Sequence, residues 1–319
     1  MRLIVFPLFL VSVLIMIWFF FLPVSSQFIE KSSVQTNLTD GVLKVIAVGD
    51  ISCPDLPATS KQCQQQATAT LAASLKPDYF LVLGDLQYGG GLLRDFQTFY
   101  DRSWGVLKDQ TWPVIGNHEY ERDATAAGYF DYFNGEGNFA GPAGDRDKGY
   151  YAIDKAGWKI IILNSNCWAI GGCDSNSPQG KWLKDQLETT SSKCQLIAFH
   201  HPRYSSGQHG INKFVRPFWE IAFANGVDLV LSGHDHVFER FAPQDGNGQF
   251  SDRGVRQFVV GTGGRNLYQF VNILPNSEKR INDQFGVLSL NLLPFGYSWQ
   301  FINTDQKILD SGEAVCQSN

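Results

Sequence analysis

The chain has 319 residues, of which 44% are hydrophobic and 13% aromatic, enough to bury the core of one catalytic domain. Its formal net charge of -5 gives no sign of a polyanion-binding surface, because nucleic-acid binders usually carry a basic excess or a basic stripe. No nucleic-acid surface is therefore indicated.

The N-terminus carries an apolar segment that indicates export. Leu3 to Leu22 form an almost unbroken apolar run. We interpret residues 1–26 as a signal peptide cleaved after small residues, or as an uncleaved membrane anchor, because the run approaches the about 20 residues that span a bilayer. Residues 3–22 would then tether the protein to a membrane. Residues 27–40 are a polar linker, and the rest of the chain is expected to be secreted, periplasmic or extracellular.

Apolar, β-rich runs recur after the linker and predict strands. Beyond Asp283 the pattern becomes strand after strand, which suggests a mixed sheet that closes the fold rather than a second domain. We therefore treat residues 41–319 as one catalytic domain. The predicted strands are Lys44–Val48, Tyr79–Leu83, Trp112–Ile115, Tyr150–Ile153, Trp158–Leu163, Gln195–Phe199, Asp228–Leu231, Gln257–Val260, Phe285–Leu292 and Tyr297–Ile302.

Helix-like stretches lie between several of these runs. Ser60 to Leu75 has apolar residues at helical spacing, and Asn212 to Ala224 is a further candidate. Ser177-Pro178 predicts a cap followed by a first-turn proline, and so the start of another helix.

Six cysteines, an even number that all follow the apolar segment, agree with a compartment outside the cytoplasm. Six cysteines allow 15 connectivities. Short local loops would be closed by Cys53 with Cys63 and by Cys167 with Cys173, and Cys194 with Cys316 would then tie the C-terminal tail to the core.

Polar residues follow the ends of five predicted strands: Asp50, Asp85, Asn117, His200 and His234. In open α/β sheets the ligand site forms where strands end and loops begin, so the five ends could meet at one edge. Carboxylates, an amide and imidazoles delivered in this way are the donors that a two-metal hydrolytic centre requires.

Glycine precedes the polar residue in four of these blocks, as Gly49, Gly84, Gly116 and Gly233. A backbone turn, or the close approach of the chain to a metal, tolerates no side chain at such positions. In the block His234-Asp235-His236, an extended segment would point both imidazoles to the same side while the carboxylate faces away.

These blocks, in this order, resemble those of the calcineurin-like metallophosphoesterases and, within them, the purple acid phosphatases. The resemblance runs from Lys44 to about Arg240, and the tail looks like that of bacterial secreted members. Asp50-Ile51-Ser52 lacks the histidine that is usual in the first block, and Gly84-Asp85-Leu86-Gln87-Tyr88 has the tyrosine that replaces it in purple acid phosphatases. The implied fold is α/β (α+β), a four-layer sandwich of two mixed β-sheets flanked by helices.

The resemblance also implies a dinuclear metal centre of Fe(III) and a divalent ion, either Fe, Zn or Mn. A phenolate suits Fe(III), and a trivalent ion can keep a tyrosine ionised far below its free pKa of about 10. By this comparison Asp50, Tyr88 and His236 would bind Fe(III), Asn117, His200 and His234 would bind the divalent ion, and Asp85 would bridge.

Two further histidines match positions that bind phosphate and assist as general acid in the family. His118 and His209 are assigned these roles, with Asn117 also contacting substrate. We expect His201 to support a ligand or the structure, and Glu119 to orient a neighbour rather than bind metal.

The implied reaction is acid phosphatase-like hydrolysis of a small phosphomonoester by a hydroxide at the dinuclear centre, with an acidic optimum. A phosphodiesterase or nucleotidase on the same site is the alternative. A non-catalytic extracellular binding module would predict lost ligands, and every ligand position is filled. The sequence specifies neither the natural ester nor an oligomeric state.

Overall fold

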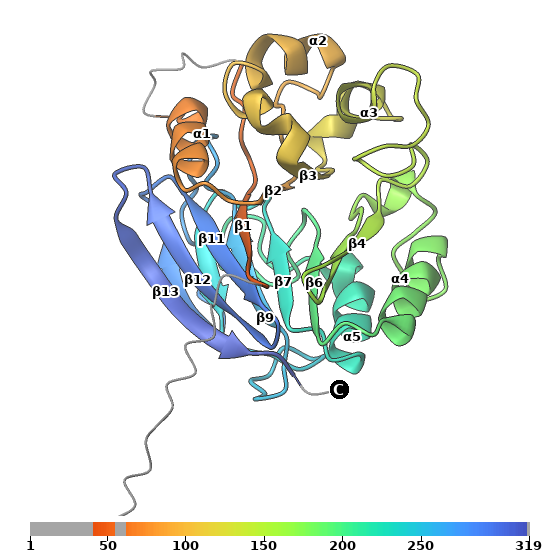
Figure 1. The fold of residues 1–319 in the computed structure, drawn as a ribbon, viewed down its shortest axis with the longest axis vertical. Helices are drawn as coiled ribbons and strands as arrows, with labels where there is room; N and C mark the ends of the chain where they lie inside the picture. The colour runs from red at the N-terminus through yellow and green to blue at the C-terminus, as the bar shows by residue number, and fades with distance from the viewer. Residues whose placement is uncertain (1–40, 55–61, 318–319) are drawn as a thin grey trace, which may run out of the picture. The chain divides into compact units, whose positions relative to one another are not determined.

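The computed structural model describes residues 41–54 and 62–317, and these described residues group as one compact unit. The strands of the first sheet are β1 (Leu43–Val48), β2 (Tyr79–Leu83), β3 (Thr111–Val114), β11 (Gly286–Leu293), β12 (Gly296–Asn303) and β13 (Ile308–Val315). Their order is β13-β12-β11-β1-β2-β3 (Figure 1). Because β1 is parallel to β2 and antiparallel to β11, this sheet is mixed.

The strands of the second sheet are β4 (Tyr151–Lys155), β5 (Trp158–Ile162), β6 (Cys194–Ala198), β7 (Leu229–Ser232), β8 (Phe238–Phe241), β9 (Arg256–Val260) and β10 (Ser277–Ile281). Their order is β10-β8-β9-β7-β6-β5-β4. Strands β5, β6, β7 and β9 are parallel, whereas β4, β8 and β10 run antiparallel to their neighbours. This sheet is therefore also mixed.

The α-helices of the described chain are α1 (Gln65–Ser74), α2 (Leu93–Asp95), α3 (Ala127–Asn134), α4 (Pro178–Thr189) and α5 (Arg216–Ala224). Segments of 3-10 or π-helix are η1 (Phe96–Tyr100), η2 (Trp104–Gln110), η3 (His118–Tyr120), η4 (Cys167–Ala169) and η5 (Lys213–Val215). At the start of α4 the Ser177 hydroxyl accepts a hydrogen bond from Gly180 N at 3.1 Å, which confirms the predicted cap.

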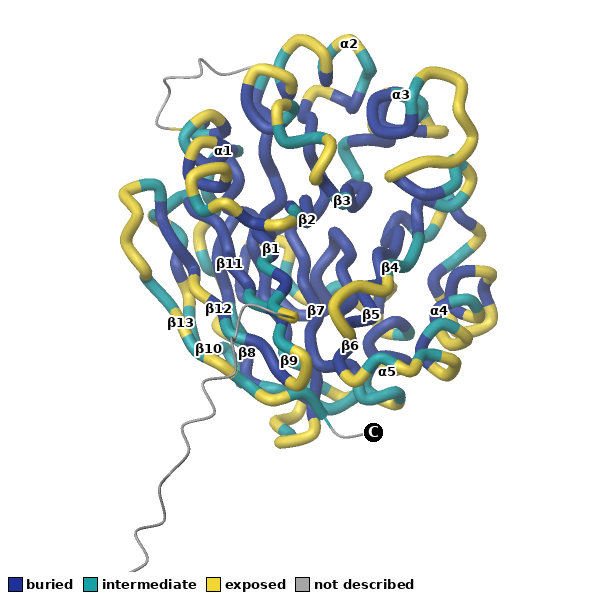
Figure 2. The backbone as a smooth tube through the Cα atoms, in the orientation of Figure 1, coloured by how far each residue is buried: buried dark blue, intermediate teal, exposed yellow. Residues whose placement is uncertain are grey.

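The two sheets pack face to face, and helices cover their outer faces. Phe301 of β12 stacks on Phe238 of β8, with ring centroids 4.1 Å apart. On the outer face of the first sheet, Phe80 of β2 meets Trp104, whose indole donates to Thr68 of α1 at 3.3 Å. Helices α4 and α5 contribute buried apolar side chains to a separate cluster with the opposite face of the second sheet. Figure 2 shows the inner strands of both sheets as buried chain, and the predicted four-layer sandwich is confirmed.

The structure adds elements that the sequence pattern did not predict: β8, β10, β13, α2 and α3. Strands β10 and β13 lie at sheet edges, where exposed and half-buried residues alternate and no apolar run forms. Strand β8 has four residues, too few for a periodic pattern. The predicted helix from Ser60 begins at Gln65, and most other boundaries differ by one or two residues.

All six cysteines lie in the described part of the chain and pair as Cys53–Cys63, Cys167–Cys173 and Cys194–Cys316. The three suggested pairs are confirmed. The predicted signal peptide or anchor (1–26) and linker (27–40) lie outside the described residues. Across 41–54 and 62–317, no helix combines the length and the apolar character needed to cross a bilayer.

Candidate metal centre

The carboxyl ends of strands from both sheets meet at one edge of the fold. Gly49 N, just after β1, donates to Val260 O at the end of β9, at 2.8 Å. Asp50 N donates to Gly84 O after β2 at 3.0 Å, and Gly233 N after β7 donates to His200 O after β6 at 3.1 Å. The first bond joins the two sheets, and the other two join neighbouring strand ends within each sheet, so the site lies between two sheets rather than at the edge of one open sheet.

The backbone turns sharply where it leaves these strands. Asp50, Asp85 and His234 have φ of 61°, 49° and 70°, in the left-handed region that non-glycine residues rarely adopt. The chain also approaches itself closely: a Cβ on Gly116 would lie 2.2 Å from Asp85 Oδ1. The glycine before the polar residue is therefore required by close packing in this block, as the sequence suggested.

Three of the predicted ligands form a first cluster. The Tyr88 hydroxyl donates to Asp50 Oδ1 at 3.0 Å and lies 2.6 Å from His236 Nε2. His236 Nε2 is also 3.4 Å from Asp50 Oδ1. A phenol, a carboxylate and an imidazole thus converge through atoms that can bind a metal, and all three side chains are buried.

A loop that follows β9 supports this first cluster, and the sequence analysis did not identify its side chains. Arg265 N donates to Asp50 O at 3.0 Å, and the guanidinium lies 4.9 Å from the centroid of the Tyr88 ring. His236 Nδ1 donates to Asn266 O at 2.7 Å, which directs Nε2 into the cluster. The Tyr268 ring stacks on His236, with centroids 3.9 Å apart.

Three of the remaining predicted ligands form a second, adjacent cluster. One ligand atom from each of Asp85, His200 and His234 lies within 4.8 Å of the others. His200 Nδ1 donates to Leu83 O at 2.8 Å, so Nε2 faces Asp85 Oδ2 at 3.2 Å. The side-chain oxygen of Asn117 is buried and has no hydrogen-bond partner among the described residues.

Burial and charge together perturb the titration of these groups. Burial alone would lower the pKa of His200, but Asp85 beside it raises that pKa above its usual value to about 9. Burial raises the pKa of Tyr88 well above its usual value, and the charge of Asp50 raises it further. In the protein alone the Tyr88 phenol is therefore neutral, and a nearby cation is needed to ionise it.

His118 and His209 lie beside the two clusters. The His118 ring is 4.3 Å from the Tyr88 ring, and His118 N donates to Asp85 Oδ1 at 3.0 Å. The His209 ring is 4.0 Å from the His234 ring, between their centroids. His209 N donates to Asp235 Oδ1 at 2.9 Å, so Asp235 fixes the loop that carries His209.

Glu119 and His201 contact backbone and side chains around the ligands. The buried Glu119 carboxylate accepts from Asp85 N, Gln87 N and Gly116 N at 2.8 to 3.1 Å, and so joins the loops that follow β2 and β3. His201 Nδ1 lies 2.8 Å from Ser165 Oγ, and its ring is 4.4 Å from the His234 ring.

The geometry of the His234-Asp235-His236 block corrects one expectation. The segment is bent rather than extended, because His234 is left-handed and Asp235 N donates to Gly233 O at 2.9 Å. His236 nevertheless reaches the first cluster and His234 the second, while Asp235 faces the His209 loop. The bend sends the two imidazoles to different halves of the site.

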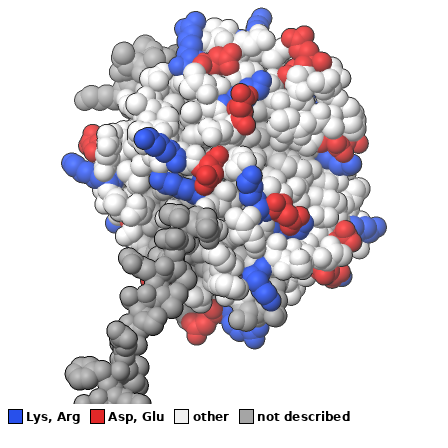
Figure 3. Space-filling view, in the orientation of Figure 1, with Lys and Arg blue, Asp and Glu red and all other residues white. Residues whose placement is uncertain are grey.

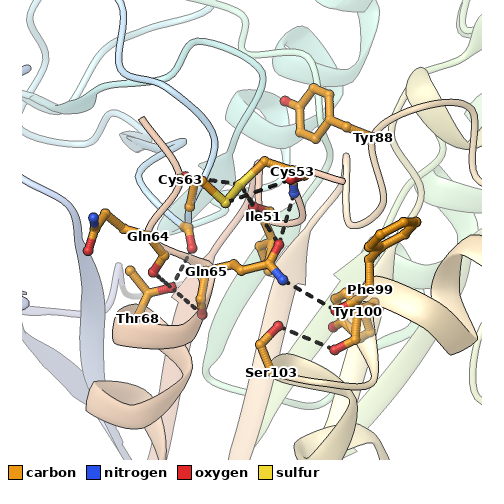
Figure 4. Close-up of a disulfide and its surroundings, with 12 residues drawn as sticks. Ile51, Cys53, Cys63, Gln64, Gln65, Thr68, Tyr88, Phe99, Tyr100 and Ser103 are labelled. Carbon is orange, nitrogen blue, oxygen red and sulfur yellow. Dashed lines mark hydrogen bonds between the residues drawn. A yellow bond between two sulfur atoms is a disulfide. The ribbon is translucent and has the colours of Figure 1, made fainter. Parts of the chain in front are cut away.

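The Cys53–Cys63 disulfide anchors the chain just after the first polar block. Cys53 N donates to Gln65 Oε1 at 2.9 Å, and Figure 4 shows Tyr88 above this disulfide. Gln65 Nε2 donates to Phe99 O at 3.2 Å. The loop that follows Asp50 is thus tied to α1 and η1.

Basic and acidic side chains are interspersed on the molecular face shown in Figure 3. This face offers no extended patch of one sign.

The chain is similar in sequence to known phosphatases. Residues 43–238, more than half of the chain, match the family model described as calcineurin-like phosphoesterase. Purple acid phosphatase 18 of Arabidopsis thaliana is 29% identical over 192 residues, which cover 58% of this chain and 43% of that protein. Tartrate-resistant acid phosphatase type 5 of Sus scrofa is 25% identical over 237 residues, 65% of this chain and 68% of that protein. The match thus spans less than half of the plant relative.

Solved structures share the fold. Purple acid phosphatase PPD1 from yellow lupin (Lupinus luteus) seeds superposes with a TM-score of 0.70 at 19% identity, covering 86% of this chain and 54% of that one. GAP50, the anchor in the inner membrane complex of Plasmodium, gives a TM-score of 0.62 at 14% identity, covering 87% and 90%.

Proposed function

The chain belongs to the calcineurin-like phosphoesterase family, and we propose that it hydrolyses phosphomonoesters at a dinuclear metal centre. One observation carries the proposal: six potential ligands converge in two adjacent clusters at one edge of two sheets, and the side-chain oxygen of a seventh, Asn117, is buried without a hydrogen-bond partner in the described chain. Burying such atoms unpaired costs free energy, which a bound cation would recover.

The residues fit a pair of metal ions of which one is trivalent and the other divalent. Asp50, Tyr88 and His236 would hold Fe(III), and the bridging Asp85 would share it with a divalent ion (Fe, Zn or Mn) held by Asn117, His200 and His234. Ionising Tyr88 beside two carboxylates is unfavourable in the protein alone. A trivalent ion opposes that repulsion more strongly than a divalent one, which supports iron in the first cluster.

The protein's own groups would bind phosphate and move the proton. Bound at these clusters, two metal ions would activate water for attack on phosphorus and neutralise charge on the phosphoryl oxygens. His118, His209 and the Asn117 amide would contact the phosphate. His118 or His209 would protonate the leaving alkoxide, so no side chain need act as nucleophile. Glu119 holds the loops of Asp85 and Gly116 in register for this geometry.

The disulfides support a place of action outside the cytosol. Three disulfides are typical of proteins outside the reducing cytosol, and we place the domain in a secreted or periplasmic compartment, with a membrane tether through residues 3–22 as the alternative to cleavage.

Metal analysis with a visible spectrum tests the centre. The purified protein should contain iron and absorb visible light through charge transfer from the Tyr88 phenolate to Fe(III). Tyr88→Phe should remove the band while the protein stays folded. A colourless, active enzyme with two zinc or two manganese ions would contradict the ferric assignment.

Activity is tested separately with Asp85→Asn. Removing the bridging charge should lower kcat/KM for a phosphomonoester by about 100-fold or more, with an unchanged circular dichroism spectrum. Asp185→Asn, on the exposed side of α4, is the matched control. A strong preference for a phosphodiester would favour the diesterase alternative, and full activity of Asp85→Asn would reject the metal mechanism.

A further inference from the structure

Large apolar side chains stand exposed beside the divalent half of the site. Trp168 is 66% exposed, Phe214 46% and Ile211 44%. Contact with water makes exposed apolar surface unfavourable, and a bound ligand that covers this surface recovers the free energy. Aromatic side chains that flank a polar site often contact ligand in this way.

Trp168 is connected to the Asn117 side of the site. Its ring meets the buried Tyr120 ring edge-on, with centroids 5.2 Å apart, and Tyr120 belongs to the turn that follows Asn117. Two residues before Trp168, Asn166 Nδ2 donates to Gly116 O at 3.1 Å. Each of these contacts joins the Trp168 loop to the block that supplies a proposed ligand.

The Trp168 loop is also held rigid. The Cys167–Cys173 disulfide closes it, and Gly172 N donates to Cys167 O at 2.8 Å. An exposed tryptophan that is fixed in this way loses little conformational entropy when it binds a ring.

Phe214 is connected to the His234 side. Its ring lies 5.3 Å from the His201 ring, and His201 lies 4.4 Å from His234. Phe214 is anchored by its neighbour Val215, which is fully buried, and by Asn212 Nδ2, which donates to Pro202 O at 2.9 Å.

The two loops are joined to each other at Ser165. Ser165 Oγ accepts from His201 N at 3.1 Å and lies 2.8 Å from His201 Nδ1. Trp168 is three residues beyond Ser165, and Phe214 packs on His201. Both loops therefore connect to the divalent half of the site: Phe214 contacts His201, which contacts His234, and Trp168 contacts Tyr120 in the turn that follows Asn117.

We propose that Trp168 and Phe214 form a subsite for an aromatic leaving group, so that the preferred substrates are aryl phosphomonoesters. This inference rests on the proposed function, because the phosphate at the metal centre is what brings the ring of the ester to these two loops. The ring would stack on Trp168 and Phe214 or meet their edges, the two arrangements that aromatic pairs prefer.

Binding of non-hydrolysable probes tests the subsite without requiring turnover. Phenylphosphonate and methylphosphonate carry the same charged head, and only the first has a ring. In titration calorimetry with the metal-loaded protein, Trp168→Ala and Phe214→Ala should each raise the dissociation constant of phenylphosphonate by about 3- to 10-fold. The dissociation constant of methylphosphonate should not change, and Trp168→Phe should restore part of the loss.

The control is Phe295→Ala. Phe295 is 70% exposed in the hairpin between β11 and β12, at the end of the first sheet opposite the metal centre. This variant should bind both phosphonates as the wild type does. Aryl and glycerol phosphates provide the kinetic counterpart: only the aryl ester should lose kcat/KM in Trp168→Ala.

Two results would overturn the subsite: equal weakening of both phosphonates, or no change in either. Failure of the proposed function itself has a different signature. A metal-loaded wild-type protein that binds neither phosphonate and hydrolyses neither ester would reject the phosphatase assignment and the subsite with it.

Discussion

At the scale of single residues, three proposed ligands combine functional chemistry with an unfavourable backbone. Asp50, Asp85 and His234 are left-handed, a conformation that costs on the order of 1–3 kcal/mol at a non-glycine residue. His234 N donates to Asp50 Oδ2 at 2.9 Å and His118 N to Asp85 Oδ1 at 3.0 Å, so each carboxylate keeps one oxygen occupied by the backbone. The turns thereby aim the other oxygen of each at the proposed metals.

Asp228 gives a prediction about pH, far from the metal centre. Its oxygens accept from Gln195 N at 2.8 Å and from Gln317 N at 2.6 Å, yet burial outweighs these bonds and raises its pKa from 3.8 to about 6. The native state therefore keeps this proton between pH 4 and 6, whereas the unfolded chain releases it. Stability from this group is present at low pH and is lost as pH rises, by up to about 3 kcal/mol.

Denaturant unfolding of the wild type and of Asp228→Asn measures this effect, because asparagine does not titrate. The unfolding free energy of the wild type relative to the variant should decrease from pH 4 to pH 6. A difference that is constant with pH would show that folding does not raise the pKa of Asp228.

At the scale of elements, the disulfides constrain very different lengths of chain. Cys194 of β6 and Cys316 after β13 are 122 residues apart and join the two sheets, whereas Cys167 and Cys173 are 6 apart within one turn. In the chain-entropy model, closing the longer loop removes more freedom from the unfolded state, by about 2–3 kcal/mol.

The corresponding double variants should separate these effects. Cys194→Ser/Cys316→Ser should lower the unfolding free energy by about 2–3 kcal/mol more than Cys167→Ser/Cys173→Ser, as measured by urea denaturation. Equal losses would mean that native packing, rather than loop entropy, sets the contribution.

Sequence reasoning succeeded best for elements with a strong local pattern. The buried strands β1, β2, β5 and β6 read as apolar runs, and α4 was identified by its Ser177 cap. Edge strands β10 and β13 escaped prediction because they are paired on one side and half exposed, so their alternation is weak. The bend at His234 was not predicted either, because it depends on the hydrogen bond from His234 N to the Asp50 carboxylate, which lies in a distant part of the chain.

At the scale of the whole molecule, the two sheets act as one support for the site. Asp50, Asp85 and Asn117 come from the first sheet, and His200, His234 and His236 follow strands of the second. Metal binding should therefore stabilise the entire domain, because the ligands are assembled only in the folded state.

Chelation tests this coupling. Removing metal should lower the melting temperature of the wild type by on the order of 5 °C or more, and adding iron with zinc should restore it. Asp85→Asn, which lacks the bridging carboxylate, should respond much less. Identical melting curves of the wild type with and without chelator would contradict a metal-linked fold.

The sequence by itself determined the donor types, their order after strand ends, the glycines that permit close approach and an even set of cysteines, because these are local features of residue type and spacing. Only the tertiary structure decided that the strand ends belong to two sheets, that Arg265 and Tyr268 lie against Tyr88 and His236, and that Trp168 packs on Tyr120 and Phe214 on His201. Those relations arise from contacts between segments that are distant in the chain, and no local pattern encodes them.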